Sequence, residues 1–201
     1  MFDLTPRTRV MSLEQIKKIH DHALKILWET GIKVDDPGAR NLFEKNLGKS
    51  AQNNIIQIPE DIVQWAIDLA PSHIPIFDRL GRSCFVLDGG GNQETVFGIG
   101  VTNLQYHDPA TDKIQPFSRY HMGLAAGLGH TLKNFDFIST PGVIQDFPAK
   151  TADILGVLEM LAHTTKPLVM LISNPDCFAT ALDLCEHLTG DLSDHPFVIP
   201  Y

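Results

Sequence analysis

Leu168-Val169-Met170-Leu171-Ile172-Ser173 is the middle one of three short apolar runs that decide the fold class. The first run covers residues 135–140 and the last covers residues 197–199, so the runs begin 33 and then 29 residues apart. This is about the 30-residue repeat of a strand–helix–strand unit. The sequence therefore predicts an α/β fold with three parallel strands between Ser118 and Tyr201. We expect apolar helix faces to pack on this sheet, namely Ile154, Leu155, Leu158, Leu161 and Ala162, then Phe178, Ala181, Leu182, Cys185 and Leu188.

Three strands are too few to close a parallel sheet. The last run, within residues 196–201, is followed by no helix, and a parallel sheet needs both faces covered. A βα (TIM) barrel of eight strands needs about 250 residues. We therefore expect residues 118–201 to be the beginning of a truncated TIM barrel and residues 1–117 to be an N-terminal extension. The chain is then the front part of a longer polypeptide.

Helix signals occupy residues 12 to 75. Ser12 and Gln15 have the spacing of a capping box, and the apolar residues that follow recur every three to four positions until Gly31. Similar signals predict one helix that begins at Asp36-Pro37 and ends at Gly48, and another between Pro59 and Pro71. We expect the first helix to bury its apolar stripe, which consists of Ile16, Ile19, Ala23 and Leu27.

The periodicity changes to short β-like runs between Ile74 and Pro116. These runs are separated by turn residues, and Gly89–Gly91 suit a tight turn that needs positive φ. The pattern predicts antiparallel hairpins. The four expected strands are Ile74–Phe77, Cys84–Leu87, Thr95–Ile99 and Leu104–Tyr106.

Composition excludes several classes of function. The chain has 16 Lys and Arg against 24 Asp and Glu, a net charge of −8, and no basic cluster, so nucleic-acid binding is not expected. Its apolar runs are far shorter than the roughly 20 residues of a membrane span. We therefore expect a cytoplasmic protein that contacts neither nucleic acid nor membrane.

Cysteine and histidine spacing predicts no metal site. Three cysteines without a Cys-x-x-Cys pair are typical of free thiols. His20 with His22, and Cys185 with His187, point to opposite sides of a helix, so neither pair can converge on a metal. Cys177 lies at the start of a predicted helix, where the helix dipole can lower a thiol pKa, but a helix-cap neighbour without a function is the better explanation.

Ligands of parallel βα sheets meet residues at the carboxyl ends of the strands. The corresponding segments here are residues 139–142, 173–175 and 200–201. The loop from Pro141 to Pro148 is longer than a minimal connection, which is typical of loops that build sites. The run Asn174-Pro175-Asp176 also fits a helix cap.

The chain resembles the N-terminal part of the trimethylamine methyltransferase family, the corrinoid-dependent methylamine and glycine-betaine methyltransferases. The resemblance covers nearly all 201 residues through short motifs in order. Family members have an N-terminal helical and β extension followed by a TIM barrel. The motifs are Leu13–His20, Leu27–Val34, Ile58–Glu60, Ala70-Pro71, Phe97–Asn103, Asn134–Phe137 and Thr164–Pro167.

This resemblance implies transfer of a methyl group from a methylated amine to the Co(I) corrinoid of a separate partner protein. It implies that this chain binds no cofactor directly, because cobalamin is carried by the partner. The family's glycine-bearing loop corresponds to residues 98–100. We expect substrate contacts from Gly98, Gly100 and Asn103, and next from the strand-end residues Thr140 and Asn174. The pyrrolysine of the trimethylamine branch belongs beyond Tyr201, so no catalytic residue is assigned.

Two alternatives stay open. The chain could be a non-catalytic remnant, or an association module that forms a homo-oligomer through its open sheet edge. It could also be part of an unrelated α/β barrel enzyme, whose metal or phosphate motif would then lie in the missing half.

Overall fold

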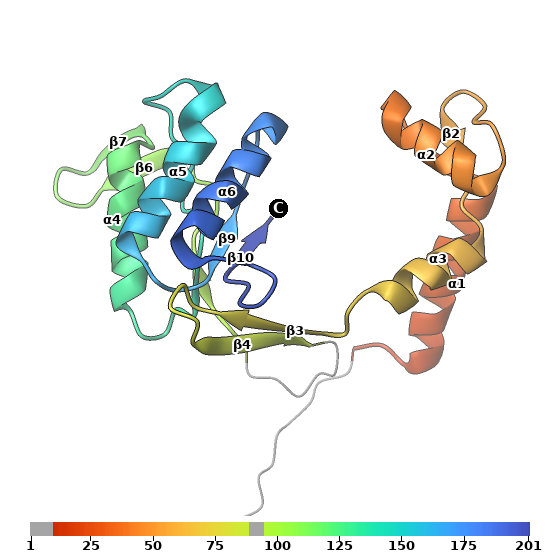
Figure 1. Ribbon diagram of the computed structural model, residues 1–201, viewed down its shortest axis with the longest axis horizontal. Helices are drawn as coiled ribbons and strands as arrows, with labels where there is room; N and C mark the ends of the chain where they lie inside the picture. Colours follow the sequence, from red (N-terminus) through yellow and green to blue (C-terminus); the bar gives the residue numbers. More distant parts are fainter. Residues whose placement is uncertain (1–9, 89–94) are drawn as a thin grey trace, which may run out of the picture. The chain divides into compact units, whose positions relative to one another are not determined.

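The computed structural model describes residues 10–88 and 95–201, and the chain forms two compact units, Met1–Pro71 and Ser72–Tyr201 (Figure 1). We call these unit 1 and unit 2. The turn expected at Gly89–Gly91 lies outside the described residues. The division that we expect at residues 117 and 118 stays a prediction of domain organisation.

Unit 1 contains three helices and a small antiparallel sheet. The helices are α1 (Leu13–Glu29), α2 (Pro37–Leu47) and α3 (Glu60–Leu69), and the sheet pairs β1 (Ile32–Lys33) with β2 (Ile55–Ile56). The capping box of α1 is confirmed, because the Ser12 hydroxyl accepts from the Gln15 amide at 3.2 Å and the Gln15 side chain accepts from the Ser12 amide at 2.8 Å. Asp36 caps α2 by accepting from the Ala39 amide at 2.7 Å, and Gly48 ends that helix with φ at 63°.

The apolar stripe of α1 is not buried, so our expectation for it is wrong. Ile16 is 47% and Ile19 is 57% exposed. Among residues 10–71, Ile56 alone is buried. The reason is that β1 and β2 have two residues each, so unit 1 offers no sheet surface wide enough to cover three amphipathic helices.

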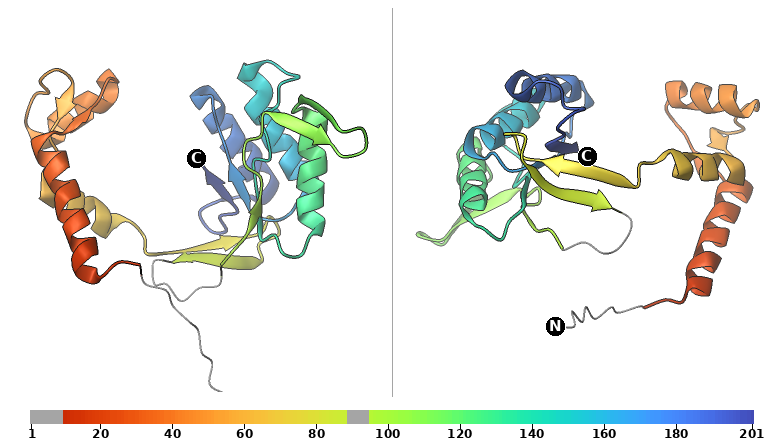
Figure 2. Two further views of the ribbon diagram at one scale, coloured as in Figure 1. Left: turned by 180° about the vertical axis from the view of Figure 1, so that it is seen from behind. Right: turned by 60° about the horizontal axis from the view of Figure 1, so that its bottom comes forward.

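Unit 2 is built on a parallel sheet in the order β10-β9-β8-β5. The strands are β5 (Gly98–Ile99), β8 (Phe137–Ser139), β9 (Leu168–Met170) and β10 (Val198–Pro200). Helices α4 (Arg119–Thr131), α5 (Ala149–His163) and α6 (Phe178–Thr189), the last preceded by the short 3-10 helix η1 (Pro175–Cys177), lie over one face (Figures 1 and 2). The three predicted parallel strands are confirmed, and the described strands form an open sheet.

The core of unit 2 lies between the sheet and these helices. Strand residues Ile138, Leu168 and Met170 pack with helix residues that include Val157 and Cys185. The predicted helix faces are confirmed in part. Leu161, Ala181 and Cys185 are buried, whereas Leu158, Phe178 and Leu188 are exposed.

The expectation that Thr95–Ile99 belongs to an antiparallel hairpin is wrong, because Gly98 and Ile99 pair parallel with Phe137 and Ile138. Two contacts fix this register. The Asp136 carboxylate accepts from the Phe97 amide at 2.8 Å, and the Asp136 amide donates to the Phe97 carbonyl at 2.7 Å. The Phe137 ring also occupies the place where a side chain at Gly98 would lie. The parallel sheet therefore begins at residue 98.

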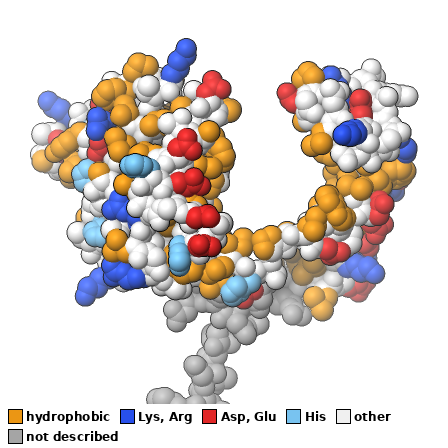
Figure 3. Space-filling view, viewed as in Figure 1, with side chains coloured by type: hydrophobic (Ala, Val, Ile, Leu, Met, Phe, Trp, Pro, Cys, Tyr) orange, Lys and Arg blue, Asp and Glu red, His pale blue; other side chains and the backbone are white. Residues whose placement is uncertain are grey.

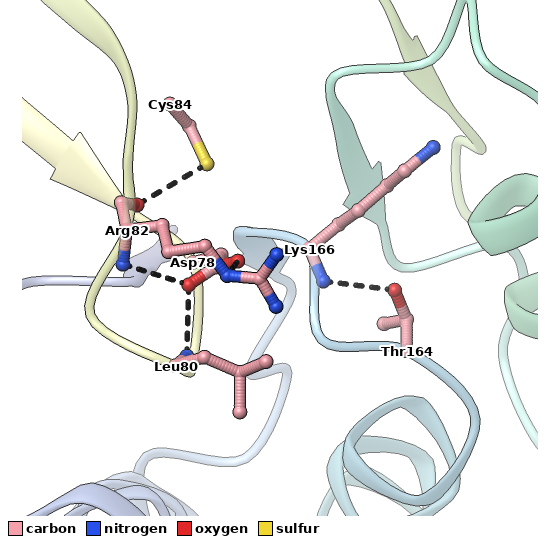
Figure 4. Close-up of polar contacts among 6 residues, drawn as sticks. All are labelled: Asp78, Leu80, Arg82, Cys84, Thr164 and Lys166. Carbon is pink, nitrogen blue, oxygen red and sulfur yellow. Dashed lines mark hydrogen bonds and ion pairs between the residues drawn. The ribbon is translucent and has the colours of Figure 1, made fainter.

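Of the other expected strands, Ile74–Phe77 and Cys84–Leu87 form the predicted hairpin, whereas Leu104–Tyr106 pairs with residues 113–116, a strand that was not predicted. Strands β3 (His73–Phe77) and β4 (Ser83–Asp88) pair antiparallel, as do β6 (Gln105–Asp108) and β7 (Lys113–Pro116). The β3–β4 turn is held by the Asp78 carboxylate, which accepts from the amides of Leu80 at 2.8 Å and Arg82 at 2.9 Å (Figure 4).

The β3–β4 hairpin lies at the amino-terminal edge of the parallel sheet. The Phe77 amide donates to the carbonyl of Pro196, just before β10, at 2.9 Å. The Arg79 amide donates to the carbonyl of Thr165, before β9, also at 2.9 Å. The hairpin is therefore bonded to the segments that lead into β9 and β10.

Lys166 ties the end of α4 to the start of β9. Its amide donates to the Thr164 hydroxyl at 3.0 Å, and its side chain points away from the β3–β4 turn (Figure 4). The ammonium nitrogen donates to the carbonyls of Gly129, Leu132 and Phe135 at 2.8, 2.8 and 2.6 Å. A cation is favourable there because the carbonyls at a helix C-terminus carry negative partial charge. Desolvation lowers the pKa of Lys166.

Candidate functional site

The carboxyl-terminal edge of the parallel sheet joins the loops that follow β5 and β8. The Thr102 amide donates to the Thr140 carbonyl at 2.8 Å. Asn103 donates twice to the Pro141 carbonyl, from its amide at 3.1 Å and from its side-chain nitrogen at 2.8 Å. The Val143 amide in turn donates to the Asn103 carbonyl at 2.9 Å. The two loops therefore continue the strand pairing beyond the sheet, with Asn103 at the junction.

Thr140 connects β8 with the chain that leaves β9. Its amide donates to the Val169 carbonyl at 2.9 Å, and its hydroxyl accepts from the Leu171 amide at 2.8 Å. The residue is buried, with 7% of its surface exposed. The buried Thr140 hydroxyl therefore holds the backbone at this edge of the sheet in place.

The predicted glycines occupy different places. Gly100 lies at the edge with φ at +118°, and an added Cβ would come within 2.6 Å of the Ser139 carbonyl oxygen. Both the positive φ and this close approach require glycine. Gly98 lies within β5 beneath the Phe137 ring. The structure thus brings Gly100, Asn103 and Thr140 together and places Gly98 inside the strand.

Asn174 is confirmed as a helix cap. Its side-chain oxygen accepts from the Asp176 amide at 3.1 Å at the start of η1. Its own amide donates to the Asp153 carboxylate at 2.8 Å. Asp153 belongs to α5, so this contact joins the loop after β9 to the helix that follows β8.

Two loop residues that sequence reasoning did not single out hold the edge as well. The Gln145 amide donates to the Phe117 carbonyl at 2.9 Å, and its side chain donates to the Leu104 carbonyl. The Asp146 carboxylate accepts from the Arg119 amide, the first of α4, at 3.0 Å. An acidic residue suits a helix N-terminus, but its position 27 residues away in the chain gives no local signal.

Buried His121 fixes the β6–β7 hairpin to α4, and sequence reasoning missed it too. Its ring stacks on Tyr106 with centroids 4.0 Å apart. Its Nδ1 accepts from the Ser118 amide at 3.1 Å, which requires a lone pair on that nitrogen. Its Nε2 lies 3.3 Å from the side-chain nitrogen of Gln115 in β7.

A small cavity lies beside this edge. A cavity lined by Thr140, Gly142, Ile144, Asp153 and other residues has about 10 Å³, which is room for one water. No group of three or more His, Cys, Asp or Glu residues that could hold a metal ion occurs in the part of the chain that the structure describes.

The C-terminal segment of unit 2 is negatively charged. Residues 167–201 contain no Lys or Arg and five carboxylates. Acidic side chains gather over the part of unit 2 that contains α6 (Figure 3). Such a field attracts cations. The carboxylates are those of Asp176, Asp183, Glu186, Asp191 and Asp194.

The cysteines are free thiols, as predicted, and they do not form a nucleophilic site. Burial raises the pKa of Cys185 to about 11. Desolvation and then the Asp153 carboxylate raise the pKa of Cys177, whose thiol lies 3.2 Å from the Lys150 carbonyl. The lowered pKa weighed for a thiol at a helix start is therefore absent at Cys177, because a thiolate there would lose its solvation.

Among the residues that the structure describes, no helix has both the length and the apolar character that crossing a membrane requires.

The comparisons with known proteins point to one family. The family model of trimethylamine methyltransferase (MTTB) matches residues 2–199. Trimethylamine methyltransferase MttB of Methanosarcina barkeri is 30% identical over 160 residues, covering 78% of this chain and 32% of that protein. Trimethylamine methyltransferase MttB of Desulfitobacterium hafniense is 22% identical over 88% of this chain and 35% of its own length. Proline betaine:corrinoid methyltransferase of Eubacterium limosum is 27% identical over 37% of this chain and 15% of its own length. The chain thus spans about a third of the length of the trimethylamine methyltransferases that it matches.

Proposed function

Since the chain belongs to the trimethylamine methyltransferase family, we propose that the protein containing it transfers a methyl group from a methylated or quaternary amine to the Co(I) corrinoid of a separate partner protein. The observation that carries this proposal is the family match across residues 2–199. The name of the proline betaine:corrinoid methyltransferase supports a corrinoid acceptor. We propose an amine of the trimethylamine or glycine betaine type.

The chemistry of such an amine sets the task of the site. When a quaternary ammonium ion gives up a methyl group, the carbon–nitrogen bond breaks and its electron pair stays on nitrogen, so a neutral tertiary amine leaves without protonation. Trimethylamine has to carry a proton on nitrogen to react in the same way, and it then leaves as neutral dimethylamine. The methyl acceptor supplies the electron pair of the new bond to carbon. The protein has to hold the cation, orient one methyl group and exclude water, which are tasks of positioning and electrostatics.

In this proposal, the carboxyl-terminal edge of the sheet forms part of the wall around the amine. Gly100, Asn103, Thr140 and Asn174 set the shape of that wall, because their polar side-chain groups and backbone are bonded to neighbouring segments. Gly98 lies inside β5, away from this wall, and its lack of a side chain lets β5 pack against the Phe137 ring. Asp176, at the start of η1 after β9, is a carboxylate on this side of the sheet and favours a cationic substrate.

A methyl-transfer assay tests the proposal. The complete gene product is mixed with a corrinoid protein reduced to Co(I) and with trimethylamine, glycine betaine or proline betaine in turn, and methylation of cobalt is followed by absorbance. We expect transfer from at least one amine, and none from any amine with the 201-residue chain alone, which spans about a third of the length of the relatives it matches. Absence of transfer from every amine by the complete product contradicts the proposal and favours a non-catalytic role.

Variants of the edge test the assigned residues separately. Asn103→Ala removes the side-chain bond to Pro141, and Thr140→Val removes the acceptor of the Leu171 amide. We expect each to lower kcat/KM by about tenfold or more, because small shifts of a positioning wall are costly. Thr189→Val is the control, since its hydroxyl donates to the Cys185 carbonyl at the far end of α6. Full activity of both edge variants in a folded protein contradicts the assignment.

A further inference from the structure

Ser139, the last residue of β8, is buried, yet its hydroxyl makes no hydrogen bond with any described residue. The residue is 6% exposed. Every fully buried polar side-chain atom of the described residues has a hydrogen-bond partner, so the unpaired Ser139 oxygen keeps some accessible surface. Since a polar group without a partner is costly in such a place, this hydroxyl is available to a group that reaches it from outside the described residues.

The Ser139 side chain lies on the face of the sheet opposite α4, α5 and α6. Ile138 packs into the core beside these helices, and successive residues of a strand point to opposite faces. Phe137 shares the face of Ser139 and lies next to Phe85 of β4, with ring centroids 6.2 Å apart. Ser139 is nearer the carboxyl end of β8 than Phe137 is. It therefore lies where ligands of parallel βα sheets bind.

Both places beside β8 in the sheet are already occupied. The strand pairs with β5 through Ile138 and Ile99, and with β9 through Ser139 and Val169. Further strands can therefore join the sheet only beyond β5 or β10, away from Ser139. Gly100, just after β5, lies against the Ser139 carbonyl and has no side chain that could cover the hydroxyl. An occupant consequently approaches over the face, at its carboxyl end.

The backbone beside this position is strained at Thr102. This residue has φ at +42°, a left-handed conformation that is costly for a β-branched side chain. Its amide donates at 2.8 Å to the carbonyl of Thr140, the residue that follows Ser139. Backbone strain of this kind is concentrated at ligand sites, where the surrounding structure maintains it. An unpaired buried hydroxyl and a strained residue, which are independent features, thus coincide at one edge.

The charges at this edge favour an ammonium group over an anionic group. Residues 98–104, 138–146, 169–176 and 198–201 contain no Lys or Arg, but they contain Asp146 and Asp176. A substrate carboxylate would find no counter-ion in these segments, whereas the two carboxylates attract a cation. A serine oxygen can accept a hydrogen bond from an N–H group. A protonated tertiary amine has one N–H group, and a quaternary ammonium ion has none.

We propose that the Ser139 oxygen accepts a hydrogen bond from the N–H group of a protonated tertiary amine such as trimethylammonium. This role rests on the proposed function and specifies the substrate class of that site. Methyl transfer breaks one carbon–nitrogen bond, whose electron pair stays on nitrogen together with the proton, so neutral dimethylamine leaves. A quaternary ion presents a methyl group to Ser139 and forms no such bond, so Ser139 favours the tertiary amine.

Calorimetric binding of two ions to the complete gene product tests the proposal. Trimethylammonium and tetramethylammonium carry the same charge and differ in whether nitrogen bears a hydrogen or a fourth methyl group. Ser139→Ala should raise the dissociation constant of trimethylammonium at least about tenfold, because a hydrogen bond to a charged group is lost. It should not raise that of tetramethylammonium. Ser193→Ala is the control, since it removes an exposed hydroxyl between α6 and β10 and should change neither constant.

Thermal unfolding of the same product gives a second measurement. The Ser139 hydroxyl has no partner to lose, so Ser139→Ala should leave the melting temperature unchanged or raise it. A lower melting temperature would mean that another part of the protein bonds the hydroxyl, and it overturns the proposal. Unchanged binding of trimethylammonium by Ser139→Ala, equal weakening of both ions, or a wild-type product that does not bind trimethylammonium also overturns it.

The methyl-transfer assay separates this role of Ser139 from the proposed function. A product that methylates cobalt from glycine betaine but does not bind trimethylammonium keeps the proposed function and contradicts the role of Ser139. A product that methylates cobalt from no amine contradicts both.

Discussion

Unit 1 and unit 2 both contain amphipathic helices, yet they differ in how those helices are held. Among residues 10–71, Ile56 alone is buried, whereas unit 2 contains a continuous core between its helices and its sheet. The helices of unit 1 have good local signals, including the capping box at Ser12 and the cap at Asp36. The difference teaches that caps and periodicity define a helix, and that a sheet of sufficient width is what buries its apolar face.

Truncation of the unit 2 core has the largest expected effect on this comparison. Phe197 is 1% exposed, and Phe197→Ala should lower the free energy of unfolding by about 3–5 kcal/mol through the cavity it leaves. The control is Trp65→Ala in unit 1, because Trp65 is 61% exposed. This substitution should change the free energy of unfolding by less than about 0.5 kcal/mol.

Urea unfolding distinguishes the two units, because both tryptophans of the chain, Trp28 and Trp65, belong to unit 1. Tryptophan fluorescence therefore follows unit 1, and hydrogen exchange of the β9 amides follows unit 2. If the two substitutions lowered the free energy of unfolding by the same amount, Trp65 would have to be buried as deeply as Phe197. That result would contradict the difference between the two units.

Two glycines of α4 allow a core-facing position and an open position to be compared within one helix. An added Cβ at Gly129 would lie 2.5 Å from Ile138 Cδ1 and 2.7 Å from Ile99 Cγ2, so Gly129→Ala should destabilise unit 2 by about 1–3 kcal/mol. Gly127→Ala is the matched control, since its Cβ meets nothing within 4 Å, and it should stabilise the helix by about 0.5–1 kcal/mol. Thermal unfolding followed by circular dichroism measures both. Effects of the same sign would show that Gly129 does not face the core.

Loss of a helix cap tests whether unit 1 depends on local contacts. Asp36→Ala removes the acceptor of the Ala39 amide and should destabilise α2 by about 1 kcal/mol. The measurement is faster hydrogen exchange of the α2 amides. Asp21→Ala, at an exposed position in the middle of α1, removes the same charge without a cap and should leave α2 unchanged. Unchanged exchange in Asp36→Ala would mean that packing already holds α2.

The smallest expected effect concerns the exposed β6–β7 hairpin of unit 2. Hydrogen bonds from the Thr111 hydroxyl and then the Ala110 amide hold the pKa of Asp108 below its ordinary value of 3.8. A lowered carboxyl pKa contributes stability above pH 3.8 that is lost as the pH falls through the folded-state pKa. Thr111→Val should move the Asp108 pKa towards 3.8 in an NMR titration, while the unfolding transition at pH 7 stays almost unchanged. A large change in that transition would show that hairpin contacts, in addition to the core, hold unit 2.

Local signals predicted more of the fold than of the candidate site. The ends of the helices follow from residues within one turn, so Ser12, Asp36, Gly48 and Pro59 placed them correctly. Strand β5 was misassigned because its two residues pair with a strand 39 residues further along. Hairpin signals close to it in the chain favoured the wrong partner.

Prediction of the candidate site was limited in the same way, because local sequence signals do not report tertiary contacts. The rule that strand ends meet placed Thr140 at this edge, whereas Asn103 was expected there only from the resemblance to the family. It could not show that their side chains are bonded to the Leu171 amide and the Pro141 carbonyl. Gln145 and His121 were missed because their partners are set by tertiary folding, at sequence positions that no periodicity links.

Lys166 commits each of its three ammonium N–H bonds to a carbonyl acceptor. Removal of one of these protons would leave a carbonyl without its donor, and the part-buried position of the nitrogen limits the access of a reagent. Amine-directed labelling reagents should consequently modify this lysine after the lysines at the surface. Acetylation of Lys166 would require the end of α4 to open first, so this amine is a chemical reporter of that opening.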